Sequence, residues 1–240
     1  MARSILTVFA HPDDAETMAG GTLLTWVHQG DRVTICVLTD GDKGTSDPND
    51  TSEAVVARRR VEQARAAARL GAEVIYLGFE DGMLQPTLEV RREVVRVVRR
   101  VRPDVVVASD PTLWFRHGLY INHPDHRAAG QAVVEALYPA VKKHLIFPEL
   151  LAEGLQPHVV EEVWLGPTDE PDQWIDIAPV LDEKIALITE HASQFEPTAT
   201  RTAFTRMARS VGEPRGLAAA EAFRTLHLAA STIRAIAEVR

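Results

Sequence analysis

The chain has 240 residues, of which 45% are hydrophobic and 25% charged, values that are ordinary for a soluble globular protein. This is enough apolar material for one sizeable α/β domain, so we treat residues 1–240 as a single domain with a C-terminal elaboration. The formal net charge is -8, and the basic residues are scattered among acidic ones, which argues against a nucleic acid partner.

Cys36 is the only cysteine and lies in an apolar run, so it is expected to pack as a small hydrophobic residue. One cysteine excludes a disulfide scaffold or a cysteine-based zinc site within one chain. The apolar run at residues 5–10 is too short for a secretory signal, and no segment is apolar enough to span a membrane. A cytoplasmic location is therefore the default expectation.

Strands and helices are predicted to alternate through the first half of the chain. In chain order, the expected elements are a strand (residues 5–10), a helix (14–29), a strand (32–39), a helix (51–70), a strand (73–77), a helix (87–101) and a strand (104–109). Such alternation implies βαβ units and a mostly parallel, Rossmann-like sheet flanked by helices. The first strand is not followed by G-x-G-x-x-G, which disfavours a dinucleotide cofactor.

The second half of the chain is less regular. A turn-rich loop (residues 40–50) and an aromatic loop (113–122) interrupt the elements and are expected to shape a pocket. The expected later elements are a helix (124–138), a strand (159–165) and helices over residues 179–191, 201–211 and 218–226. This C-terminal third is expected to pack on the sheet and to supply one wall of the site.

Two short segments concentrate side chains that bind zinc. His11-Pro12-Asp13-Asp14 follows the first strand, and His123-Pro124-Asp125-His126 precedes a helix. If Pro12 takes the first helical position, one turn brings His11 and Asp14 toward a common point, and His126 can add a third ligand. Two histidines and one carboxylate leave a fourth tetrahedral position open, which is the arrangement of a catalytic zinc, one Zn²⁺ per chain.

The remaining side chains of the two segments have the chemistry of amide hydrolysis. Asp13 points away from its neighbour Asp14 and can act as the general base toward water. His123 shares a helix face with His126, so it can stabilise an oxyanion or protonate the leaving amine, and Asp125 can orient or charge it. The alternative is that each segment is merely a helix start, since Asp and Pro are common there.

Among the other histidines, His191 is ambiguous between a structural and a functional role. Surface or packing roles are expected for the rest, namely His28, His117, His144, His158 and His227.

The two segments together resemble the LmbE-like, or PIG-L, family of zinc-dependent N-acetylglucosaminyl deacetylases. Further matches are Leu38-Thr39-Asp40-Gly41, Arg59-Arg60-Val61-Glu62, Leu70-Gly71, residues 102–106 and His191-Ala192-Ser193-Gln194. The resemblance implies zinc binding by His11, Asp14 and His126, a general base at Asp13 and transition-state assistance by His123. It also implies substrate contact by Arg59 and assembly into a homo-oligomer. A tyrosine that some relatives carry two positions before His123 is replaced by Ile121, with Tyr120 one position earlier.

The leading hypothesis is hydrolysis of the acetamide of an N-acetylated amino sugar or sugar conjugate at one zinc. Close alternatives are an amidase of a thiol-sugar conjugate and a metal-dependent phosphoesterase, although the ligand count supports only one metal. A non-catalytic sugar- or metal-binding protein is a third alternative, but such a protein needs no free carboxylate at Asp13. The sequence does not identify the acceptor sugar.

Overall fold

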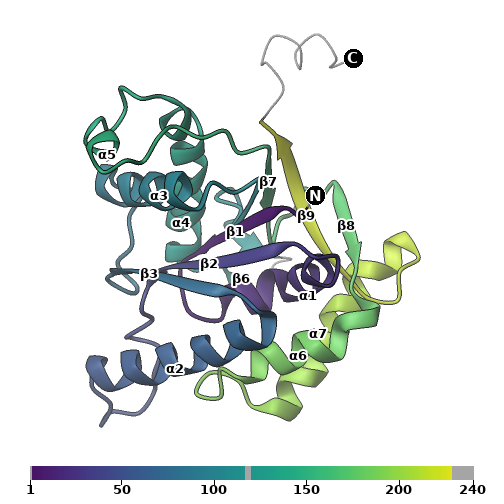
Figure 1. Ribbon diagram of the computed structural model, residues 1–240. Coiled ribbons are helices and arrows are strands. Elements are labelled where there is room, and N and C mark those ends of the chain that lie inside the picture. Colours follow the sequence, from purple (N-terminus) through teal and green to yellow (C-terminus); the bar gives the residue numbers. More distant parts are fainter. Residues whose placement is uncertain (1, 117–119, 229–240) are drawn as a thin grey trace.

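The computed structural model describes residues 2–116 and 120–228, which form one mixed seven-stranded sheet with helices on both faces. The strand order is β3-β2-β1-β4-β7-β9-β8, and the first five of these strands run parallel. Strand β9 is antiparallel to its neighbours β7 and β8. Figure 1 shows α3, α4 and α5 on one side of the sheet and α1, α2, α6 and α7 on the other. The expected Rossmann-like α/β class is confirmed.

The elements of the first half agree closely with the sequence prediction. Their bounds are β1 Ser4–Phe9, α1 Asp14–His28, β2 Arg32–Thr39, α2 Ser52–Leu70, β3 Glu73–Phe79, α3 Leu88–Val101 and β4 Val105–Ala108. The Thr51 side chain accepts a hydrogen bond from the backbone N–H of Ala54 and so caps α2, which ends at Gly71 with a positive φ of 71°.

The sheet separates two hydrophobic cores. Along β1, Leu6 and Val8 face the core beneath α3 and α4, whereas Ile5 and Phe9 face the core beneath α1 and α6. This alternation follows from the two-residue period of a strand, and burial of both faces explains why apolar residues predominate on them. Cys36 is fully buried in the first of these cores, as expected.

The second half departs from the prediction in several elements. Its bounds are β5 Phe115–Arg116, β6 Tyr120–Ile121, α4 Pro124–Leu137, α5 Glu149–Ala152, β7 Glu162–Leu165, β8 Gln173–Asp176, α6 Leu181–Thr189, α7 Pro197–Gly212 and β9 Ala220–His227. The helix expected over residues 218–226 is wrong, because this segment is strand β9. The expectation also missed β8 and the small β5–β6 pair.

Strand β9 forms because it pairs with two strands that are distant in sequence. Phe223 lies opposite Gln173, and Leu226 lies opposite Val163. The Glu221 carboxylate is buried and accepts the backbone N–H groups of Gly21 and Thr22 at 2.9 and 2.8 Å. These long-range bonds override the helix propensity of an alanine-rich segment.

Gly21 of α1 packs tightly against the segment before α6. A Cβ at this position would lie only 2.7 Å from the Ile177 side chain. Tight packing therefore accounts for this glycine. Among the described residues, the structure has no helix that is both long and apolar enough to cross a membrane.

Candidate metal centre and active site

The two histidine-containing segments meet at the carboxyl edge of the parallel strands. His11 follows β1, and His123 caps the start of α4, which the chain enters after β4 and the β5–β6 pair. Strands β1 and β4 are neighbours, but the chain leaves β1 toward β2 on the other side. This is a topological switch point, where parallel α/β sheets open a crevice for ligands.

His11, Asp14 and His126 bring three ligand atoms together. His11 Nδ1 lies 3.2 Å from His126 Nε2 and 3.4 Å from Asp14 Oδ2, and His126 Nε2 lies 3.1 Å from Asp14 Oδ1. A tetrahedral zinc with bonds of about 2.0–2.1 Å holds its ligand atoms about 3.3 Å apart. The spacing of the three atoms therefore fits one zinc ion.

The polar groups on the far side of each ring favour one tautomer of each histidine. The buried amide of Asn122 donates to Leu113 O at 2.8 Å, so its Oδ1 accepts from His126 Nδ1 at 3.1 Å. His11 Nε2 lies 3.1 Å from Asp81 Oδ1 and 3.4 Å from Asp125 Oδ2; it makes no well-aligned hydrogen bond to either, but the two negative charges favour a proton on this nitrogen. With these tautomers, the two neutral imidazoles would direct lone pairs at the same point beside Asp14, which makes that point suited to a cation.

The electrostatics around His11 also favour a cation. Burial by itself lowers the pKa of His11, but hydrogen bonds to the surrounding carboxylates, Asp125 foremost, outweigh burial and raise the pKa to about 12. The pKa of Asp14 is held well below its usual range: burial raises it, but the charge of His126 and the bond to His11 outweigh burial. The pocket of carboxylates thus stabilises positive charge at the point where the three ligand atoms meet.

Asp81 is a residue of this site that the sequence analysis missed. It follows β3 by two residues, and its carboxylate accepts the backbone N–H of Lys43 at 2.9 Å in addition to facing His11. Burial tends to raise the pKa of Asp81, but the bonds to His11 and Lys43 lower it to about 2. Its place at the end of a parallel strand was the available signal.

Asp125 orients a different histidine from the one expected. Its carboxylate accepts the backbone N–H groups of Gly82 and Leu84 at 2.7 and 3.3 Å and lies 3.4 Å from His11 Nε2. The expected carboxylate contact with His123 is absent among the described side chains. Instead, His123 Nδ1 accepts the backbone N–H of Asp125 at 3.2 Å.

His123 stands at the exposed rim of the centre. Its ring packs edge-on against His11, with ring centroids 4.7 Å apart. Partial burial lowers the pKa of His123, and the nearby His11 and His126 lower it further. The charge of Asp125 acts in the opposite direction and raises the pKa of His123, but burial and the two histidines outweigh it.

Asp13 is held in a strained conformation beside the ligands. Its φ is 96°, a left-handed value that is uncommon for a residue other than glycine and that marks functional sites when the surroundings enforce it. The Asp13 N–H donates to Gln63 Oε1 at 3.1 Å, and Oδ2 accepts from Arg59 Nη2 at 2.8 Å. Burial foremost and then the charge of Asp14 raise the pKa of Asp13 to about 6, against the opposing effect of Arg59.

Arg59 is the buried member of three consecutive arginines. Its guanidinium donates to Gly41 O at 2.9 Å and to Pro12 O at 2.7 Å, besides Asp13, and its side chain is only 5% exposed. A Cβ on Gly41 would lie 2.1 Å from Arg59 Nη1, so only glycine admits this approach. Arg58 and Arg60 instead pair with Asp50 and Asp40 at the surface. The structure therefore places Arg59 against the protein's own backbone rather than in the open crevice.

His191 is fully buried behind Asp13. Its Nε2 lies 3.5 Å from Glu16 Oε2, while Glu16 Oε1 accepts from Gln63 Nε2 at 2.7 Å. Burial lowers the pKa of His191, but the bond to Glu16 outweighs it and raises the pKa. Ser193 donates its backbone N–H and its hydroxyl to Glu62. The C-terminal third thus supports the Asp13 loop through α2.

The remaining expected residues lie at the margin. Ile121 is 72% exposed and Tyr120 is 49% exposed, and neither occupies the metal centre. His28 and His227 are surface residues, and His158 bonds to Pro103 O at 2.7 Å. His117 lies outside the described residues.

Known proteins share this site's segments and fold. The PIG-L family, described as GlcNAc-PI de-N-acetylase, matches residues 6–137. Diacetylchitobiose deacetylase of Thermococcus kodakarensis is 37% identical over 194 residues, covering 80% of this chain and 70% of that protein. A probable N-acetyl-alpha-D-glucosaminyl L-malate deacetylase 2 of Bacillus anthracis is 30% identical, covering 82% and 84%.

A solved structure agrees with these sequence matches. N,N'-diacetylchitobiose deacetylase from Pyrococcus horikoshii, in complex with an inhibitor, superposes with a TM-score of 0.87 at 30% identity. The match covers 94% of this chain and 84% of that one. The chain belongs to the PIG-L family of de-N-acetylases.

Proposed function

We propose that this protein hydrolyses the acetamide of an N-acetylated amino sugar conjugate, using one zinc ion bound by His11, Asp14 and His126. The observation that carries the proposal is the pair of imidazole nitrogens 3.2 Å apart, both able to offer a lone pair to a cation, beside the Asp14 carboxylate. Zinc held there supplies a Lewis acid for the amide carbonyl and favours deprotonation of water. The names of the relatives, which are deacetylases of N-acetylglucosamine compounds, support the substrate class.

Asp13 serves as the general base in this proposal. Arg59 binds its Oδ2, and no hydrogen bond within the described part of the chain occupies Oδ1, which is left to accept a proton from the attacking water. The strained backbone keeps the Asp13 carboxylate beside Asp14, where it is not one of the three proposed metal ligands. Arg59 and Gln63 position Asp13 and are not assigned contact with the substrate.

His123 assists the departing amine and the developing oxyanion. It projects at the rim beside His11, where a substrate amide can reach it. Asp81 and Asp125 orient His11 through its Nε2, as carboxylates commonly orient zinc-binding histidines.

The geometry disfavours the alternative of a two-metal phosphoesterase. Among the described residues, the two groups that could hold a metal share His11, so they form one centre and not two. A protein that only binds a sugar or a metal would not need Asp13 in its strained, positive-φ conformation.

The test is amine release from N-acetylglucosamine and its glycosides by zinc-loaded protein, with metal content measured on the same sample. We expect one zinc per chain and release of acetate equal to free amine. Stoichiometric zinc without amine release from any N-acetylated sugar would contradict the proposal.

We also propose that residues 1–240 act as one domain, in the cytoplasm, as a symmetric homo-oligomer. The single sheet, into which the C-terminal strands β8 and β9 are built, supports the first point. A monomer in analytical ultracentrifugation at micromolar concentration would contradict the oligomer.

A further inference from the structure

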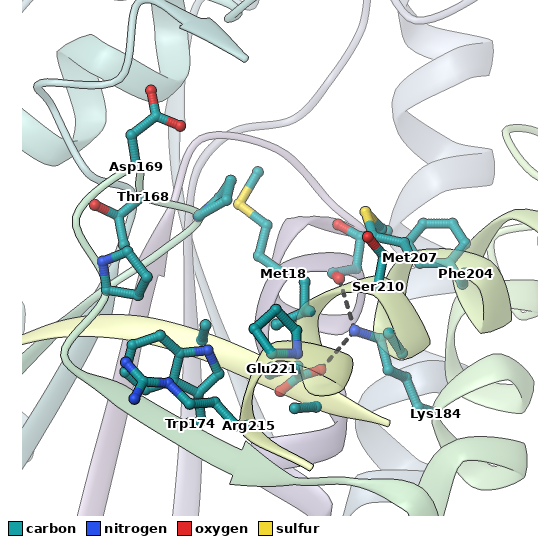
Figure 2. Close-up of a pocket in the computed structure, with 18 of the residues that line it drawn as sticks. Met18, Thr168, Asp169, Trp174, Lys184, Phe204, Met207, Ser210, Arg215 and Glu221 are labelled. Carbon is teal, nitrogen blue, oxygen red and sulfur yellow. Dashed lines mark hydrogen bonds and ion pairs between the residues drawn. The ribbon is translucent and has the colours of Figure 1, made fainter. Parts of the chain in front are cut away.

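A cavity of about 670 Å³ opens beside β8, β9 and α7. In Figure 2 its walls include Trp174 and Arg215 on one side and Phe204 and Met207 on the other. The cavity is separate from the metal centre, because none of the three proposed ligands lines it. The mechanism proposed above does not use it.

The cavity nevertheless adjoins both segments that carry the metal ligands. Thr17 and Met18 line it and lie one turn of α1 after Asp14, which is a rise of about 5.4 Å. Thr17 Oγ1 donates to Asp14 O at 3.2 Å. Tyr120, another lining residue, precedes His123 by three positions. The cavity and the metal centre thus share the first turns of α1 and the segment before α4, which places the cavity beside a substrate bound at the metal.

The lining favours an apolar group. Met18, Trp174, Phe204 and Met207 supply hydrocarbon, sulfur and aromatic surface, and Arg215 stacks over the Trp174 ring at 3.7 Å. The polar lining residues Thr168, Asp169 and Ser210 lie at half-buried or exposed positions, so a group rich in hydroxyls would find its partners near solvent and would lose water without compensation against the apolar wall.

The buried charges of the cavity are already neutralised within the protein. Lys184 Nζ donates to Glu221 Oε1 at 2.5 Å and to Thr17 O at 2.9 Å. Dashed lines in Figure 2 mark the interactions of Lys184. Glu221 in turn accepts two backbone N–H groups of α1. The charges of Lys184 and Glu221 therefore neutralise each other, and this wall of the cavity does not attract an anionic ligand.

We propose that this cavity binds an apolar aglycone, an aryl or medium-length alkyl group attached to the amino sugar that is deacetylated at the metal centre. The inference rests on the proposed function and specifies the chemical class of the group attached to the amino sugar. A cavity of this volume lies within the range of about 300–1,000 Å³ that is usual for small-molecule sites.

The experiment compares hexyl and methyl N-acetylglucosaminides, as both anomers, with zinc-loaded protein. Each buried CH₂ adds about fourfold to binding, so burial of only two of the five additional carbons gives a kcat/KM ratio of at least about tenfold for hexyl over methyl. Ser210→Trp fills the cavity from an exposed position on α7 and should bring this ratio close to one. Ala203→Trp, an exposed position of the same helix outside the cavity lining, is the matched control and should keep the wild-type ratio.

Titration of hexyl glucoside, which has no acetamide, separates failure of the inference from failure of the proposed function. We expect wild-type protein and Ala203→Trp to bind it and Ser210→Trp to bind it at least about tenfold more weakly. A hexyl-to-methyl ratio near one in active wild-type protein, or an unchanged ratio in Ser210→Trp, would overturn the inference. Amine release from no glycoside would overturn the proposed function, and absence of binding in the titration would then overturn the cavity assignment as well.

Discussion

Replacing Arg59 by lysine tests whether this residue positions the Asp13 loop or contacts the substrate. Two nitrogen atoms of the guanidinium serve three oxygens, of which two are the backbone carbonyls of Pro12 and Gly41. A lysine ammonium is a single point charge on a narrower stem and cannot reproduce contacts made from two separated nitrogens. Arg59→Lys therefore keeps the charge near Asp13 but leaves at least one buried carbonyl without its donor.

The size of the effect follows from these contacts. One buried acceptor without a partner costs about 1–3 kcal/mol of unfolding free energy. Arg59→Met, which also leaves Asp13 without its charge partner, should cost about 3–5 kcal/mol. Because a displacement of about 1 Å at a catalytic group can cost about 10²-fold in rate, we expect kcat of Arg59→Lys to fall by one to two orders of magnitude. KM should change little.

The assay combines urea unfolding with steady-state amine release from an N-acetylglucosamine glycoside. Arg58→Lys is the matched control, since the Arg58 side chain pairs with Asp50 at the surface one position earlier in α2, and it should leave both measurements unchanged. A rise in KM with unchanged kcat and unchanged stability in Arg59→Lys would refute the positioning role. It would restore the substrate contact that the family resemblance implies.

Four further substitutions separate the roles at the metal centre. His11→Ala should remove most of the zinc, and a full equivalent retained by the purified variant would refute the ligand assignment. Asp13→Asn should keep the zinc and lose about 10²–10⁴-fold in kcat, whereas near-normal turnover would mean that another group takes the proton from water. His123→Ala should lower kcat far more than KM without loss of metal, and loss of zinc would show that it is a ligand. Asp81→Asn should weaken zinc affinity by about 10–100-fold in a competition titration with a chelator, because His11 loses its partner at Nε2, and unchanged affinity would contradict this role.

The sequence was a good guide where the information is local. The parallel strands β1 to β4 are rich in apolar and β-branched residues, and helices such as α2 carry a cap and a closing glycine in the sequence itself. Both histidine segments could be placed because each adjoins a predicted strand or helix. The order of strands and helices then brings His11 and His126 to one edge of the sheet, as the sequence predicted for the proposed metal centre.

Contacts between distant segments could not be predicted in this way. Asp81 reaches His11 only because β3 and β1 end at the same edge, and Asp125 turns toward His11 because the backbone of residues 82–84 binds its carboxylate. The direction of a short carboxylate depends on which donors the fold places around it, and the sequence spacing between Asp125 and His123 does not contain that information.

The sequence by itself determined the class of the fold, the two histidine-containing segments of the proposed metal centre and the family. Tertiary structure decided that Arg59 is buried against Gly41, that residues 220–227 form a strand and that an apolar cavity lies beside α1. The physical reason is the sequence separation over which each kind of interaction acts. Periodicity, caps and motif spacing act within about one helix or strand, whereas burial, pairing across a sheet and the shape of a cavity depend on segments as far apart as Gly21 and Glu221.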